Sequence, residues 1–308
     1  MARKKSKKSS QKKQVNKIRK VLTTIIFICV LIYGCYELFK YMQQNPNGTS
    51  SQITTTDWSD TDLPTSYEGQ YYKSIDMESD SLFSDLKKLT KDTHHTEINY
   101  GDVKEYTKYS DVDPTNKNNI ILLYSRASIS GEWVSGGKTW NREHVWPKSL
   151  SGGLYNEMGE STRGAGADLH HLRPADPTIN STRNNTRYGE IENFSGSVSE
   201  IKYNNVGTGN FYIGDTVYEP RDDIKGDIAR ILLYLYTRYY DEGTLKVENV
   251  INTKEKTESS AFELLVKWDE SDPADPLEFI RNNYIETLQG NRNPFIDNKG
   301  LARKLFIK

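Results

Sequence analysis

The first 42 residues combine a strongly basic segment with a long uncharged apolar run. Residues 1–20 contain ten Lys or Arg and no acidic residue, and the next 16 residues carry no charge. An α-helix needs about 20 residues to cross the roughly 30 Å hydrocarbon core of a bilayer. Extending the run to Met42, with Glu37 and Lys40 reaching back to the interface, provides that length. The sequence therefore predicts a transmembrane helix at residues 21–42, with the basic segment in the cytoplasm and the rest of the chain outside.

Three interpretations of this N-terminal segment remain open. A signal anchor, which keeps the chain at the cell membrane by a single span, is favoured because the basic region is long and no A-x-A cleavage site follows. A cleaved secretory signal would instead release the rest of the chain. A lipoprotein signal is the third, since residues 32–35 resemble a lipobox that ends at Cys35, but Tyr33 and the apolar residues up to Met42 argue against it.

The remainder of the chain is acidic and has no thiol. The full sequence carries 41 Lys+Arg and 42 Asp+Glu, which leaves 31 basic against 42 acidic side chains after residue 20. The strongly negative mean hydropathy excludes a polytopic membrane protein. Both cysteines, Cys29 and Cys35, lie in the predicted span, so a disulfide-stapled scaffold is excluded. Residues 43–66 include ten Ser or Thr and predict a flexible linker, so a single folded domain is expected over 67–308.

The pattern of apolar residues predicts a helix-rich α+β domain. Helices are expected at residues 81–89, 228–240, 259–268 and 275–288, the second of which is apolar on most faces and should be buried. A buried strand is expected at residues 119–124, and a short strand or extended segment at residues 168–173. The turn at Ser135-Gly136-Gly137 predicts a hairpin over residues 131–145. Asp176 followed by Pro177 is typical of a helix start.

Residues suited to chemistry gather in two motifs and the helix after them. His144 lies in the segment NREHVWP (residues 141–147), and the segment DLHHLRP follows at residues 168–174. Four side chains then recur at spacings of three, four and seven, which on a helix would place them on one face: Asn180, Arg183, Asn184 and Arg187.

These residue types fit metal-assisted hydrolysis of a phosphodiester. Carboxylate and amide oxygens suit Mg²⁺, and a neutral imidazole beside the ion can remove a proton from an attacking water. The cation and an arginine can stabilise the negative charge that develops on the phosphate. One geometric condition applies to Glu143 and His144. Adjacent residues of a regular strand point to opposite faces, so both reach one site only at a twisted strand end or a bulge.

The motif around His144 also resembles a known family. Residues 140–149 strongly resemble the active-site strand of the endonuclease I family, which comprises secreted or periplasmic nucleases of the ββα-metal (His-Me finger) class. Residues 168–185 are similar to that family's second strand and metal helix, and residues 113–125 and 289–297 to two further segments. The resemblance spans roughly residues 70–305, with the blocks in the family's order, and implies a ββα-metal motif within the α+β domain.

The resemblance implies roles for individual residues. His144 corresponds to the general base, and Glu143 and Asn180 to the ligands of one Mg²⁺, for which Mn²⁺ can substitute. Three arginines are candidates for the residue that assists the phosphate: Arg163, Arg183 and Arg187. A backbone carbonyl near Gly166 would orient the base, and no small-molecule cofactor is expected.

The other histidines are interpreted as structural. His170 and His171 have no cysteine partner for a zinc site, so we expect one of them to form hydrogen bonds within the site. His94 and His95 are expected at the surface. Arg292 is expected to hold the C-terminal segment in place by hydrogen bonds.

Together these features predict a membrane-tethered extracellular endonuclease with little sequence specificity, acting on DNA, RNA or both. Because the domain is acidic, a local basic cleft is needed to bind the nucleic acid. Two alternatives remain: an extracellular ribonuclease with a preference for RNA, and a non-catalytic surface protein that captures nucleic acid for uptake. The second has no use for a general base, so His144 in its motif argues against it.

Overall fold

The computed structural model describes residues 63–134, 136–155, 157–203, 206–214 and 216–307. Within these ranges, no helix combines the length and the apolar character that a membrane span requires. The predicted transmembrane helix, the basic segment before it and the linker as far as residue 62 lie outside the described residues. These N-terminal features therefore stay predictions.

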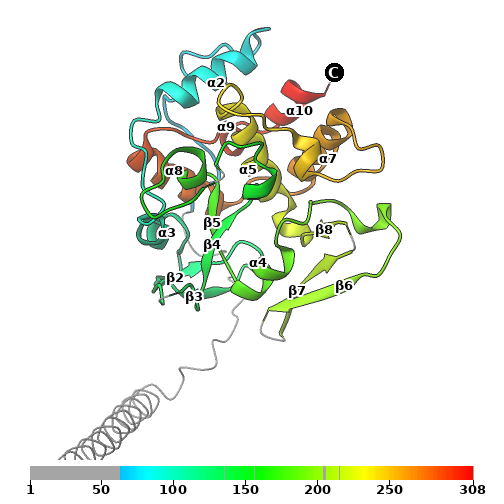
Figure 1. The fold of residues 1–308 in the computed structure, drawn as a ribbon. Helices are drawn as coiled ribbons and strands as arrows, with labels where there is room; N and C mark the ends of the chain where they lie inside the picture. Colours follow the sequence, from blue (N-terminus) through cyan, green and yellow to red (C-terminus); the bar gives the residue numbers. More distant parts are fainter. Residues whose placement is uncertain (1–62, 135, 156, 204–205, 215, 308) are drawn as a thin grey trace, which may run out of the picture. The chain divides into compact units, whose positions relative to one another are not determined.

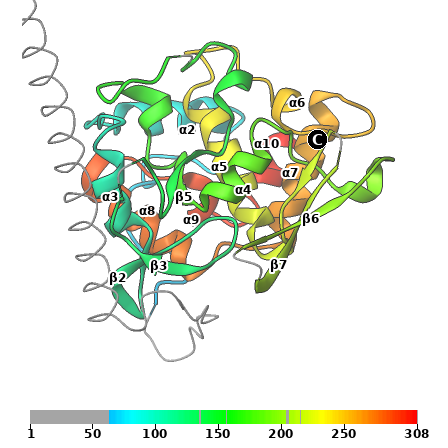
Figure 2. The same ribbon diagram turned by 60° about the horizontal axis from the view of Figure 1, so that its bottom comes forward.

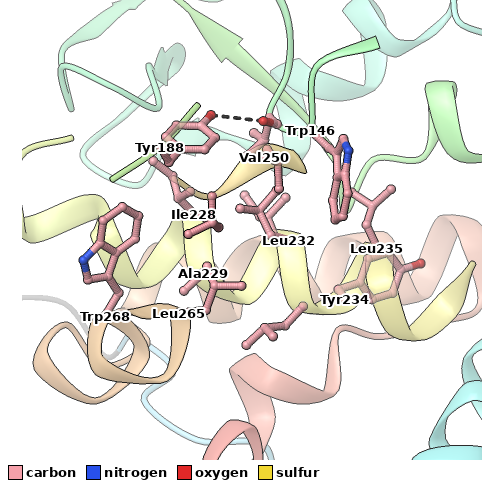
Figure 3. Packing of buried hydrophobic residues seen from close by; sticks show 14 of the residues in the cluster. Trp146, Tyr188, Ile228, Ala229, Leu232, Tyr234, Leu235, Val250, Leu265 and Trp268 are labelled. Carbon is pink, nitrogen blue, oxygen red and sulfur yellow. Dashed lines mark hydrogen bonds between the residues drawn. The ribbon is translucent and has the colours of Figure 1, made fainter. Parts of the chain in front are cut away.

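Helix α5 (Lys225–Arg238) forms the centre of the fold, and all 14 of its residues are buried. Its apolar side chains occupy most of its faces, so it needs cover on every side. Helices α2 (Leu82–Asp92), α7 (Glu258–Ser271) and α9 (Pro294–Asp297) pack against it (Figure 1). Trp146, Val250 and Trp268 pack around this helix from other elements (Figure 3). The buried helix predicted at residues 228–240 is confirmed, with its start three residues earlier.

Capping residues set the ends of the outer helices. Helix α8 (Pro276–Gln289) begins with a capping box of Asp275 and Glu278 and ends at Gly290, whose φ of 92° suits a residue without a Cβ. It packs against α3 (Val103–Ser110), while α10 (Leu301–Phe306) and the short α6 (Val247–Val250) pack against α7. The helices predicted at 81–89, 259–268 and 275–288 are thus confirmed as α2, α7 and α8.

Small antiparallel sheets complete an α+β fold in the part of the chain that the structure describes. The first contains β1 (Val112–Asp113), β2 (Asn116–Ile121) and β3 (Ser128–Ser130), and the second pairs β4 (Asn141–His144) with β5 (Leu172–Ala175). The third contains β6 (Ser199–Tyr203), β7 (Val206–Ile213) and β8 (Tyr218–Glu219). In Figures 1 and 2 the third sheet and α3 lie on opposite sides of the β4–β5 pair.

The hairpin predicted over residues 131–145 is wrong. The turn exists, with Gly136 and Gly137 at φ values of 81° and 68°, but β3 pairs with β2 and β4 pairs with β5. A local turn signal does not determine which strand pairs with β4, because that choice depends on contacts distant in sequence. The strand predicted at 119–124 is displaced, since β2 ends at Ile121. Of the strand or extended segment predicted at 168–173, only Leu172 and Arg173 belong to β5, after a turn at residues 168–171.

The third sheet was missed by the sequence analysis. Strand β7 reads VGTGNFYI and contains Gly207, Gly209 and Asn210. Glycine and asparagine are depleted in strands, and here they interrupt the apolar alternation that identifies one. The sheet forms because its strands pair with one another, with Ile201 opposite Phe211 and Ile213 opposite Tyr218.

Truncation of a core residue of α5 should destabilise the domain strongly. Leu232 is fully buried, so Leu232→Ala leaves a cavity and should lower the free energy of unfolding by about 2–5 kcal/mol. Val134, which is 44% exposed, is the control, and Val134→Ala should cost less than about 0.5 kcal/mol. Urea denaturation measures both. Equal losses in the two variants would contradict the central place of α5.

Candidate active site

Strands β4 and β5 and helix α4 form one continuous unit. The strands pair in an antiparallel register that ends with His144 opposite Leu172. Helix α4 (Pro177–Arg183) begins directly after β5. There the Asp176 carboxylate accepts hydrogen bonds from two backbone N–H groups of the first turn, at 2.8 and 3.0 Å, and Pro177 takes a first-turn position that needs no N–H. The predicted helix start is confirmed, and α4 is placed beside the end of β4.

A cleft of about 470 Å³ opens at the end of β4, beside α4. Its lining includes six charged or polar side chains of interest: Arg142, Glu143, His144, Lys148, Asn180 and Arg183. Four of them are residues that the sequence singled out. Glu143 and His144 reach the same cleft because His144 is the last residue of β4, and the β4–β5 register contains no bulge. The end of β4 thus allows both adjacent side chains to reach one site without a bulge.

His144 is held between aromatic rings and a backbone carbonyl. Its Nε2 lies 2.9 Å from the Gly166 carbonyl oxygen, the contact that the sequence analysis expected. The rings of Tyr100 and Tyr155 stack against it, each with a centroid separation of 5.5 Å. Burial, together with the neighbouring His171, lowers the pKa of His144 to about 3. The imidazole is therefore neutral at pH 7, and with Nε2–H donating to Gly166 its Nδ1 carries the lone pair.

Glu143 is buried and has one oxygen engaged. Its Oε1 accepts a hydrogen bond of 2.5 Å from the Tyr124 hydroxyl and lies 3.1 Å from Nη1 of Arg183. Burial raises the pKa of Glu143 above its ordinary value, while Arg183 and Tyr124 act against this rise and favour the carboxylate. Among the described residues, no side chain or backbone group engages the second oxygen, Oε2.

Arg183 connects the end of α4 to the strand. It is 1% exposed, and its Nη2 donates to the Val145 carbonyl at 2.7 Å. Its Nη1 donates to the Asn184 carbonyl at 2.8 Å, and the guanidinium lies 4.5 Å above the ring of Tyr188. The side chain is thus fixed by several partners, and its charge lies beside Glu143 at the inner side of the cleft.

Asn180 and Glu143 offer the oxygen atoms that a divalent cation prefers. The Asn180 side-chain N–H donates to Oδ1 of Asn141 at 2.7 Å, so the Asn180 amide oxygen points away from Asn141. Within the described ranges, no group of three or more His, Cys, Asp or Glu could hold a metal ion. One carboxylate and one amide suit an ion that keeps most of its waters, as Mg²⁺ does, so the residues present fit such a cation.

The structure separates the three candidate arginines. Arg183 lines the cleft, whereas Arg163 is exposed, donates to the Asn99 side chain at 2.9 Å and is not among the residues that line the cleft. Arg187 lines a neighbouring cavity.

The single helix face predicted for residues 180–187 is wrong. Helix α4 ends at Arg183, and Asn184 adopts φ 52°, so the chain leaves the helical path before Arg187. A positive φ is uncommon in a residue with a Cβ, and asparagine adopts it more often than most residues. Asn180 and Arg183 remain on α4, and Asn184 and Asn185 line the cleft from the segment that follows.

The remaining histidines hold the structure around the site. His171 is fully buried, with its Nε2 accepting from the Trp146 backbone N–H at 3.0 Å and its Nδ1 lying 3.1 Å from the Ala165 carbonyl oxygen. Nε2 of His170 lies 3.1 Å from the Asn291 carbonyl oxygen. These contacts confirm the structural interpretation. His95 is exposed as predicted, but the prediction for His94 is wrong, because its side chain is 2% exposed and faces Asp168 at 4.0 Å.

Several residues of the site were not singled out from the sequence. Tyr124 contacts Glu143, Tyr100 and Tyr155 stack on His144, and Arg142 lines the cleft with its guanidinium 3.6 Å from the Tyr100 ring centre. Tyr124 ends the apolar run at 119–124 and Arg142 lies in the motif of His144. Both therefore belong to segments that the sequence singles out, but nothing in the sequence assigns either residue a role. A tyrosine elsewhere in the chain carries no local sign that it packs on a histidine.

Comparison with known proteins identifies the family. Residues 79–300 match the endonuclease I family. The chain belongs to the endonuclease I family. Membership places it among the nucleases and agrees with the resemblance seen around His144.

Relatives in this family act on both kinds of nucleic acid, according to their names. The chain is 39% identical over 277 residues to an extracellular ribonuclease of Bacillus subtilis strain 168. This alignment covers 86% of this chain and 87% of that protein. An extracellular ribonuclease of Bacillus amyloliquefaciens is 38% identical over 266 residues, with 84% and 82% covered. A periplasmic deoxyribonuclease of Aeromonas hydrophila is 28% identical over 199 residues, with 57% and 75% covered.

The buried histidines should make the fold sensitive to acid. Burial lowers the pKa of His171 from 6.5 to about 4 in the folded state, so between these values the unfolded chain binds more protons. Neutral His171 contributes its full stabilisation above pH 6.5. As the pH falls from 6.5 to 4, the free energy of unfolding should decrease by about 3 kcal/mol. Urea denaturation of the wild type and His171→Gln from pH 7.5 to 4 measures it. The variant should be less stable at neutral pH and show a shallower decline.

The exposed His95 provides the control for this experiment. His95→Gln should follow the wild-type pH dependence throughout. If the free energy of unfolding declined equally with falling pH in His171→Gln and in the wild type, a neutral buried His171 would be contradicted.

Proposed function

We propose that the protein is an extracellular, metal-dependent endonuclease that hydrolyses phosphodiester bonds of RNA or DNA with little sequence specificity. The observation that carries the proposal is the meeting of Glu143, His144, Asn180 and Arg183 in one cleft, in a chain of the endonuclease I family. The β4–β5–α4 unit, with its two antiparallel strands and following helix, serves as the ββα-metal motif of this proposal.

His144 acts as the general base. A neutral imidazole with Nε2–H donating to the Gly166 carbonyl has its free lone pair on Nδ1, which accepts a proton from the attacking water. The stacked rings of Tyr100 and Tyr155 hold the imidazole in this orientation. The pKa of about 3 keeps the base neutral over the whole physiological pH range.

Glu143 and Asn180 would hold one Mg²⁺, for which Mn²⁺ can substitute, through the carboxylate and amide oxygens described above. A bound divalent cation supplies positive charge that stabilises the phosphate in its transition state and the departing oxygen. Tyr124 and Arg183 orient the Glu143 carboxylate through its other oxygen. No small-molecule cofactor is required for this chemistry.

Basic side chains bind the phosphates. Arg142 and Lys148 line the cleft, and Lys148 is exposed. Arg183 lies deeper, so we assign it the stabilisation of negative charge at the reacting phosphate together with the positioning of Glu143. Arg163 has no place at this cleft and is not part of the proposed mechanism.

RNA is the favoured substrate within this proposal. The two Bacillus relatives named as ribonucleases are each matched over more than four fifths of both chains, whereas the deoxyribonuclease of Aeromonas hydrophila is matched over 57% of this chain. Attack by water does not involve the 2′-hydroxyl, so the chemistry itself permits both sugars. A non-catalytic uptake protein would not need the neutral, oriented imidazole of His144.

We further propose that residues 21–42 anchor the nuclease at the outer face of the cell membrane. The relatives are named as extracellular or periplasmic, which supports export of the domain. The basic segment before the apolar run supports retention by a single span. Release by signal cleavage is the alternative.

Replacing the base should greatly reduce turnover while leaving the fold intact. His144→Ala should lower kcat by about 10²–10⁴-fold, and EDTA should abolish cleavage by the wild type. Circular single-stranded RNA and circular single-stranded DNA serve as substrates, because only an endonuclease opens a circle. His95→Ala, at an exposed histidine, should retain full activity.

The relative rates on the two circles decide the preferred sugar, and we expect faster opening of the RNA circle. Glu143→Gln and Asn180→Ala should each raise the Mg²⁺ concentration needed for half-maximal activity. Binding without cleavage of any circle, with Mg²⁺ or Mn²⁺, would overturn the enzyme proposal and favour the uptake protein.

The anchor proposal is tested by fractionation of cells that express the full chain. The protein should stay with the membranes after an alkaline carbonate wash, and external protease should remove its nuclease domain. A variant without residues 21–42 should lose membrane association. A shortened form in the culture medium would contradict the anchor and support cleavage of a secretory signal.

A further inference from the structure

A second cavity, of about 630 Å³, adjoins the cleft of His144. It is formed by the segment after α4, by residues 193–195 and by residues that precede α7. Asn185 lines both cavities, and the chain from Asn184 to Arg187 passes from one to the other. A substrate strand bound in the cleft could therefore continue directly into this cavity.

The second cavity has a strongly positive lining. Among the described residues that line it, the charged ones are Arg187, Lys254 and Lys256, and none is acidic. Within the described residues, none of the three forms a salt bridge. Glu255, between the two lysines in sequence, does not line the cavity. Acidic residues outnumber basic ones in the chain after residue 20, so this cluster differs in sign from the net charge of that part of the chain. We call it the basic pocket.

The loop that carries the two lysines is held in a defined shape. Lys256 has φ 53°, a conformation that costs free energy for a residue with a Cβ. Its backbone N–H donates to the Thr253 hydroxyl at 3.1 Å, and Thr257 caps the first turn of α7 immediately afterwards. The lysines are thus fixed at the rim of the basic pocket by the backbone, while their exposed side chains remain available.

We propose that the basic pocket binds phosphates of the substrate strand next to the scissile phosphodiester. This inference rests on the proposed nuclease function and adds a subsite to it. Lys254, Lys256 and Arg187 would contact successive phosphates, which carry no base information and so preserve broad specificity. Phe194, half-buried in the wall of the basic pocket, offers an apolar face to a sugar or a base.

The test compares K254Q/K256Q with K73Q in the full chain. Lys73 is exposed and lines neither cavity, so K73Q is the control for removal of a surface charge away from the basic pocket. On a long single-stranded RNA, K254Q/K256Q should raise KM several-fold with little change in kcat, and K73Q should change neither. On a dinucleotide, which fills only the cleft, K254Q/K256Q should raise KM much less.

Salt dependence provides a second measurement. For single strands, each neutralised phosphate contributes about 0.7 to the slope of log K against log salt concentration, so loss of two contacts should reduce the slope by about 1.4. If the wild type cleaves RNA and K254Q/K256Q behaves as K73Q does in both KM and salt slope, the subsite is wrong and the nuclease function stands. If the wild type cleaves no nucleic acid, the proposed function itself fails.

Discussion

The buried carboxylate of Asp168 joins the β4–β5 unit to the helical core. It precedes β5 and accepts hydrogen bonds from Tyr234 of α5 at 2.7 Å, from Tyr239 directly after α5 at 2.9 Å, and from Gln289 of α8 at 2.9 Å. Burial raises its pKa, but the facing histidines and these donors hold the pKa of Asp168 well below its usual range. A charge is tolerated at such a depth only with several donors, so the strand and two helices must keep their relative positions.

The buried ion pair of Arg183 and Glu143 fixes the side chains at the inner side of the cleft. Arg183 fastens the end of α4 to the Val145 carbonyl and lies beside Glu143, while His144 is clamped by Gly166 and by stacked rings. These groups lose little freedom when a substrate binds, because packing has already fixed them. The exposed lysines of the basic pocket suit a different task, the binding of a repeating charge in any sequence.

Local patterns predicted the helices well and the strands less well. Helix α5 was readable from an apolar run, and the start of α4 from the capping Asp176 and the following Pro177, because helices are built from contacts within a few residues. The partner of β4 could not be read in the same way, since residues 141–144 pair with residues 172–175 across a long loop. The glycine-rich β7 lacked any local signal. Asn184 ended α4 early, although helical spacing continued to Arg187.

The sequence by itself determined the residue types of the site, because the motif around His144 and the capped helix that carries Asn180 are local arrangements. Tertiary structure alone decided that Arg183, and not Arg163, lies at the cleft, that Tyr124 bonds to Glu143, and that Lys254 lines the same cavity as Arg187. These outcomes depend on which distant segments pack together. That choice is made by burial of the whole core around α5, and no short stretch of sequence contains it.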